Sequence, residues 1–211
     1  MPDPTTLAFF AVAAVALLIV PGPVVIYTVA RSVDQGLKAG LASTVAVGCG
    51  DFCHVLAATL GLSALLASSA TAFAVVKYAG AAYLLYLGVR ALLSRPQPIT
   101  AEAPRPQPIG RIASQGFLVA LLNPKTSLFF LAFLPQFVDA SHSSASSQVF
   151  LLGSIFVLLG VCTNTTFAVL AGVARRWLRQ NRAVTRHQRF LTGGVYIGLG
   201  LTAAFAGGER R

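Results

Sequence analysis

The sequence predicts an all-α integral membrane protein with six transmembrane helices, arranged as two inverted three-helix repeats. Three observations predict this fold. The chain is unusually apolar, its apolar residues fall into long stretches almost without charge, and prolines interrupt the first and fourth of these stretches in similar ways. The first and fourth helices are therefore expected to be broken, at Pro21-Gly22-Pro23 and at Asn123-Pro124-Lys125.

The composition excludes several classes of protein. Of the 211 residues, 55% are hydrophobic and only 10% are Asp, Glu, Lys or Arg, whereas a soluble domain carries about 25% charged residues. The mean hydropathy of +0.73 is too high for an intrinsically disordered chain. A lipid environment explains this composition, because side chains that face lipid are apolar.

Six stretches are long enough to cross a bilayer, which takes about 20 apolar residues in a helix. The predicted spans cover residues 6–29, 40–66, 70–92, 112–136, 148–172 and 189–207. The runs are continuous rather than alternating in polarity, and they are too few for a closed β-barrel. The chain is therefore expected to be helical.

The spans divide into two halves of three. The first repeat is expected at residues 1–93 and the second at 112–211, with a Pro-rich cytoplasmic linker at 94–111. The third and sixth spans share a basic residue followed by a glycine eleven positions later. An odd number of spans per repeat places the second copy upside down in the membrane. Inverted repeats with corresponding broken helices are typical of secondary transporters, although apolar segments can also resemble each other by chance.

The basic residues predict the orientation. Six spans place twelve of the sixteen Lys and Arg residues in loops on one side, and that side is expected to be cytoplasmic. Both termini then face outward. Five arginines at steps of four and three, from Arg175 to Arg189, form one helix face. This face either contacts anionic lipid headgroups or serves only as a topology signal. Nucleic-acid binding is not expected, because the basic face lies against a membrane and Trp177 is the only aromatic residue between Arg175 and Arg189.

Two charged residues fall inside predicted spans. Asp51 lies about 20 Å into the second span, and Lys125 lies at a similar depth in the fourth. Such charges usually face the bundle interior. Lys125 is a candidate to bind a substrate carboxylate, and Asp51 to bind an ammonium group or carry a proton. The alternative is an Asp51–Lys125 ion pair that only fixes the helix register.

Two further polar residues are candidates near this depth. His54 follows Asp51 by three residues and either relays protons with it or donates a single hydrogen bond. Asn164 in the fifth span either lines a polar cavity or, as we expect, forms an interhelical hydrogen bond. Small residues on the second span allow close helix packing and permit a homodimer without requiring one.

The positions of the cysteines suggest metal export as a second possible function. Cys49, Cys53 and His54 lie close together on one predicted helix, and soft ligands of this kind suit a heavy metal. The second half of a zinc motif is absent, however, so no resident metal or cofactor is expected. A thiol–disulfide enzyme is also not expected, because the two broken spans contain no cysteine.

Several motifs together resemble the LysE/RhtB family of amino-acid exporters. They are Val20-Pro21-Gly22-Pro23, the stretch from Gly36 to Leu62 with Asp51, the segment from Lys77 to Gly88, Leu122-Asn123-Pro124-Lys125, and Leu134-Pro135-Gln136-Phe137. The resemblance runs from about residue 10 to about residue 140.

The resemblance implies a function and a place in the cell. Members export threonine, homoserine, homoserine lactone, lysine or leucine across the bacterial inner membrane, driven by a proton or ion gradient. It also implies a binding site lined by Pro21, Gly22 and Pro23, by Asn123, Pro124 and Lys125, and by Asp51. We therefore expect a secondary amino-acid exporter, with a heavy-metal or other cation exporter of a related fold as the alternative.

Overall fold

The computed structural model describes residues 2–68, 107–139 and 145–174, together with eight isolated positions between 75 and 197. Every regular element in these ranges is helical, as the sequence predicts. The predicted spans at 70–92 and 189–207 lie outside the described residues, apart from the isolated positions. Most of the Pro-rich linker and the Arg175–Arg189 face lie outside them as well.

The first predicted span is a pair of helices, α1 (Pro4–Ile19) and α2 (Pro23–Gln35), which meet at an angle of 55°. Prolines explain the break. In a continuous helix the N–H of residue 21 would bond to the Leu17 carbonyl and that of residue 23 to the Ile19 carbonyl, but proline has no N–H to give. Val20 N–H bonds to the Leu17 carbonyl instead, at 3.1 Å. The predicted break at Pro21-Gly22-Pro23 is confirmed.

The long helix α3 (Leu37–Ser68) follows α2 after a single residue. That residue, Gly36, has a φ of +90°, a backbone angle that residues with a Cβ rarely adopt. The glycine lets the chain reverse direction at once, so that α2 packs back along α3. Asp51 lies near the middle of α3.

The fourth predicted span is also interrupted. It consists of α5 (Ile109–Leu121), the short α6 (Pro124–Leu128), a π-helical segment (Phe129–Phe133) and a 3₁₀ turn (Leu134–Phe137). The break at Asn123-Pro124-Lys125 is therefore confirmed. Despite this break, the stretch from Ile109 to Phe137 is long and apolar enough to cross a membrane as one span of 29 residues, whereas α1 and α2 are bent by 55°.

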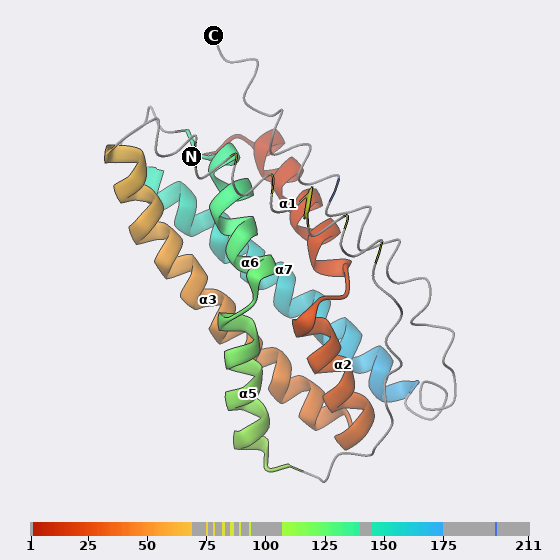
Figure 1. Cartoon of the computed structure of the whole chain (residues 1–211). Coiled ribbons are helices and arrows are strands. Elements are labelled where there is room, and N and C mark those ends of the chain that lie inside the picture. Colours follow the sequence, from red (N-terminus) through yellow and green to blue (C-terminus); the bar gives the residue numbers. More distant parts are fainter. Residues whose placement is uncertain are drawn as a thin grey trace.

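The fifth predicted span is α7 (Ala145–Val173). In Figure 1, α3 and α7 extend along most of the bundle, with α1 and α6 beside them in the upper half and α2 and α5 in the lower half. Among the described residues, three helical stretches are long and apolar enough to cross a membrane, and the bent α1–α2 pair makes a fourth if it counts as one span. Large apolar side chains such as Val45, Leu60 and Leu158 remain exposed, which suits contact with lipid.

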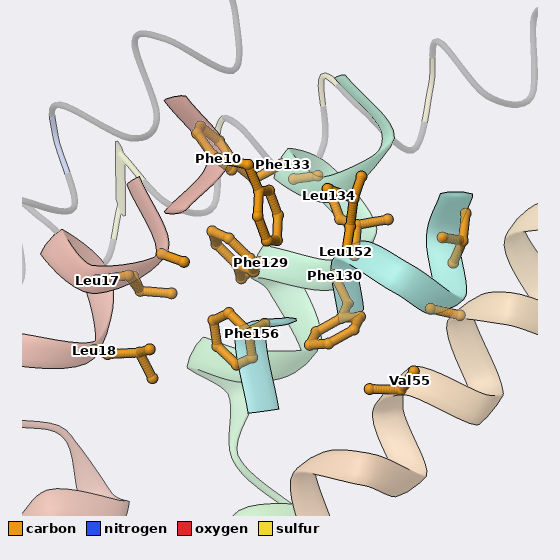
Figure 2. Close-up of a cluster of buried hydrophobic side chains, with 14 residues drawn as sticks. Phe10, Leu17, Leu18, Val55, Phe129, Phe130, Phe133, Leu134, Leu152 and Phe156 are labelled. Carbon is orange, nitrogen blue, oxygen red and sulfur yellow. The ribbon is translucent and has the colours of Figure 1, made fainter. Parts of the chain in front are cut away.

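The two halves of the bundle pack differently. In the upper half, α1, the π-helical segment and α7 bury a group of aromatic rings, in which Phe129 stacks on Phe156 with ring centroids 4.7 Å apart (Figure 2). In the lower half the contacts involve small and polar residues. The Ser32 hydroxyl donates to the Ala168 carbonyl on α7, and a Cβ at Gly40 would lie 2.8 Å from Ser32. The two breaks lie between these halves.

Candidate functional site

A small cavity lies where the two broken helices meet α3 and α7. It is lined by residues from both breaks and from α1, α2, α3, α6 and α7: Leu18, Gly22, Val24, Val25, Asp51, Asn123, Lys125, Thr126, Phe156 and Asn164. About 20 Å³ is open to the centre of a water molecule, which is room for about one water. The cavity therefore needs to widen before it can hold an amino acid.

The structure brings both charged residues of the spans to this cavity. Asp51 is only 4% exposed and Lys125 only 6%, which confirms that both face the interior. They do not form a direct ion pair. Instead, Lys125 Nζ donates a 2.7 Å hydrogen bond to the Val20 carbonyl in the α1–α2 break. The two charges still interact through space, so the alternative of an Asp51–Lys125 pair that fixes the helix register is not decided by this geometry.

The hydrogen bond from Lys125 satisfies a backbone carbonyl that the first break leaves without a helical donor. Val20 lies in the unwound segment, so its carbonyl has no helical partner, and such a group is costly in a membrane unless it finds a donor. Gly22 makes the contact sterically possible, because a Cβ there would lie 3.3 Å from Lys125 Cδ. The ammonium group has three N–H donors, and the bond to Val20 uses one of them.

The second break is stabilised by its own side chain. Asn123 Oδ1 accepts the Lys125 N–H at 3.2 Å, and Asn123 Nδ2 donates to Thr126 Oγ1 at 2.9 Å. Asn123 is thus the N-cap of α6, and both ends of its amide are engaged. Thr126, which the sequence analysis did not single out, lies beside the Asp51 carboxyl. Its place two residues after a prolyl helix start is the only signal in the sequence.

His54 on α3 contacts the backbone at the same break. Pro124 cannot donate to the Ala120 carbonyl as a regular helical residue would. That oxygen accepts the Asn123 N–H at 3.0 Å and also lies 3.2 Å from His54 Nε2. A ring protonated on Nε2 donates this bond. The ring also stacks near Phe130, with centroids 6.3 Å apart. His54 does not line the cavity, so this geometry corresponds to the single-hydrogen-bond alternative.

Asn164 on α7 does line the cavity and is 2% exposed. Its Nδ2 donates to the Gly160 carbonyl one turn earlier on the same helix, at 3.0 Å. The expected interhelical hydrogen bond is therefore wrong, because the donor turns back along α7. Its Oδ1, like Asp51 Oδ1, is buried without a hydrogen-bond partner among the described residues.

The cysteines lie apart from the cavity. Cys49 and Cys162 are exposed and Cys53 is partly buried. In the described part of the chain, no group of three or more His, Cys, Asp and Glu side chains is close enough to hold a metal ion.

The start of α2 supplies a further feature of the cavity wall. Helix α2 begins with Pro23, its N-cap Gly22 has no side chain to cap it, and Val24 and Val25 follow in the lining. N–H groups in the first turn of a helix have no helical acceptor and favour anions. The cavity thus combines hydrogen-bond donors and a cation on one wall with a carboxylate on another.

Comparison with known proteins identifies relatives of the whole chain. The chain is 29% identical over 194 residues to an uncharacterized membrane protein of Vibrio cholerae, covering 92% of this chain and 93% of the relative. It is 27% identical over 194 residues to the leucine efflux protein of Salmonella typhimurium, covering 90% of each chain. No solved structure matches it. The family model for the LysE type translocator matches residues 15–207.

These matches extend over nearly the whole chain, including the segments beyond the described residues. They agree with the helical spans and the lipid-suited surface seen here. The chain is thus a multi-pass membrane protein and a transporter rather than an enzyme, and it belongs to the LysE type translocator family.

Proposed function

We propose that this protein exports amino acids or their derivatives from the cytoplasm by proton-coupled secondary transport. The observation that carries the proposal is the single cavity that contains both helix breaks, Asp51 and Lys125. A zwitterion needs opposite charges in one cavity, and this cavity supplies them. The leucine efflux relatives support an amino acid as the cargo.

The carboxylate of the substrate would bind on the side of the first break. Lys125 retains two N–H donors beyond its bond to Val20, and the first turn of α2 adds peptide N–H groups and the positive end of a helix dipole. Pro21, Gly22 and Pro23 create this arrangement by unwinding the chain. Asn123 and Pro124 hold the second break open beside it.

Proton coupling is assigned to Asp51. Its carboxyl is buried, faces the cavity and has one oxygen without a protein partner. Protonation from outside would weaken its hold on a substrate ammonium group and release the cargo. His54 lies one turn further along α3 and stays a candidate relay, although it would have to release the Ala120 carbonyl first.

The two-repeat architecture supports alternating access. We propose six spans, with an inverted repeat in residues 1–93 and another in 112–211, joined by the cytoplasmic linker 94–111. Corresponding breaks in the first and fourth spans favour this arrangement. The excess of basic residues in alternate loops favours termini outside, and the Arg175–Arg189 face would then lie against anionic lipid on the cytoplasmic side.

Efflux from loaded vesicles tests this function. Purified protein is reconstituted into liposomes that contain labelled amino acids, leucine first, and release is followed with and without a pH gradient. We expect gradient-driven release from the native protein and none from Asp51→Asn at equal protein content. Asp34→Asn makes the same chemical change at the end of α2, away from the cavity lining, and should retain transport. Unchanged release by Asp51→Asn would remove Asp51 from the mechanism.

A further inference from the structure

Two oxygen atoms of the cavity-lining residues are buried without a protein hydrogen-bond partner in the described part of the chain. They are Asp51 Oδ1 on α3 and Asn164 Oδ1 on α7, and their residues are 4% and 2% exposed. Buried acceptors without partners destabilise a fold and are rare in native proteins. Two of them at one cavity therefore indicate a binding role rather than a packing accident.

Asp51 and Asn164 line the same cavity from two neighbouring helices. Asn164 Nδ2 donates to the Gly160 carbonyl, which orients the amide and leaves Oδ1 as an acceptor without a protein partner. A Cβ at Gly160 would lie 4.0 Å from Asp51 Oδ2, so the carboxyl lies against α7 one helical turn from Asn164.

Charge and size define what the pair of oxygens can bind. Lys125, the nearby cation, is bonded to Val20 and makes no direct pair with Asp51, so the carboxyl is left without a bonded cation. The remaining wall is largely apolar, with Leu18 and Phe156, and the Thr126 hydroxyl is a neutral donor beside the carboxyl. The cavity has room for about one water molecule. A primary ammonium group is a cationic donor of that size, whereas a dimethylated or acylated amine is larger.

We propose that Asn164 and Asp51 together form a subsite for the primary ammonium group of the substrate, and that Asn164 determines selectivity for unsubstituted amines. This inference rests on the proposed export function and deepens it. The carboxyl provides charge, and the amide oxygen provides a second, directional acceptor. N-alkylation removes donors and adds volume at this subsite, so discrimination should follow the substitution of the nitrogen.

The test uses the full chain in proteoliposomes and compares Asn164→Leu with Thr163→Val. Leucine has nearly the shape of asparagine but no acceptor. Thr163 is the neighbouring residue on α7, its hydroxyl bonds back to the Leu159 carbonyl, and it does not line the cavity. Counterflow of labelled leucine is measured in competition with N-methylleucine, N,N-dimethylleucine and N-acetylleucine.

For the native protein and Thr163→Val, we expect N,N-dimethylleucine and N-acetylleucine to compete at least about tenfold more weakly than leucine, the effect of losing a charged hydrogen bond. In Asn164→Leu the KM for leucine should rise about tenfold or more, while inhibition by N,N-dimethylleucine changes little. An Asn164→Leu protein with native KM and native discrimination would overturn the proposal. So would a variant that alters the sodium dependence of transport but not the choice of amine, because the subsite would then hold an inorganic cation.

A binding measurement separates this inference from the export function. Isoamylamine and leucinamide carry a primary ammonium group but no carboxylate, and their effect on the melting temperature of the purified protein needs no transport. Both should stabilise the native protein and Thr163→Val but not Asn164→Leu. If this pattern appears without any amino-acid transport, the export function fails and the subsite stands. If transport is present but neither amine stabilises the native protein, the subsite fails and the export function stands.

Discussion

A methyl group added at Gly50 should destabilise the protein, because α5 lies close against α3 at this position. A Cβ at this position would lie 2.7 Å from the Phe117 carbonyl oxygen and 2.7 Å from Ala120 Cβ. Ordinary contacts begin near 3.4 Å, so the helices must separate by about 0.7 Å or more. Backbone atoms supply much of this contact, so a side-chain rotation cannot relieve it.

The magnitude follows from two opposing effects in Gly50→Ala. Overpacking costs about 1–3 kcal/mol, and replacing glycine within a helix returns about 0.5–1 kcal/mol. The net loss of about 1–2 kcal/mol lowers the melting temperature of a chain of this size by about 2–8 °C. The same separation stretches the 3.2 Å contact between His54 Nε2 and the Ala120 carbonyl beyond hydrogen-bond range.

The matched control is Gly61→Ala on the same helix. Among the described residues, no atom lies within 4 Å of a Cβ placed there, so only the gain in helix propensity remains. Its melting temperature should rise by about 1–4 °C. Both variants are compared in one detergent at one heating rate, because membrane proteins often unfold irreversibly. Shifts of the same sign and size in the two variants would refute the close approach of α3 and α5.

Three further predictions test other parts of the molecule. Lys125→Ala should weaken export of carboxylate-bearing substrates more than that of their esters or lactones, measured by vesicle efflux; equal losses would argue against direct contact with the carboxylate. Epitope tags at either terminus should be accessible from outside intact cells, and labelling only after permeabilisation would overturn the proposed topology. Thr6 donates through its N–H and hydroxyl to Asp3 and holds the pKa of that carboxyl below its usual value, so the cap is complete above the usual pKa and is lost as pH falls through the lowered one. Amide exchange at the start of α1, corrected for intrinsic rates, should quicken over that range in the native protein and show no such step in Asp3→Ala.

The backbone breaks were predictable because they follow from covalent chemistry. Pro21, Pro23 and Pro124 each remove a helical hydrogen bond whatever surrounds them, and the chain unwinds at these residues. The inward direction of Asp51 and Lys125 was predictable for a similar reason. A charge facing lipid is so unfavourable that the bundle interior is almost the only place for it.

The partners of the polar side chains were not predictable. Lys125 bonds to the Val20 carbonyl rather than to Asp51, and this choice depends on how two distant segments pack. Asn123 caps α6 and His54 contacts the Ala120 carbonyl, whereas the family resemblance implied substrate binding for Asn123 and the sequence left His54 open between a proton relay and a single hydrogen bond. The π-helical winding of Phe129–Phe133 also has no clear sequence signal, since the same residues would suit a regular helix.

The bond between Lys125 and Val20 joins residues that are 105 positions apart, and this separation matters while the protein is being made. A ribosome delivers the chain from its N-terminus, so the first bent helix reaches the bilayer long before Lys125 has been translated. Until then the Val20 carbonyl lacks its eventual donor, and water or the insertion machinery must satisfy it. Insertion of the N-terminal part of the chain thus ends in an incomplete intermediate, which only the later part of the nascent chain can finish.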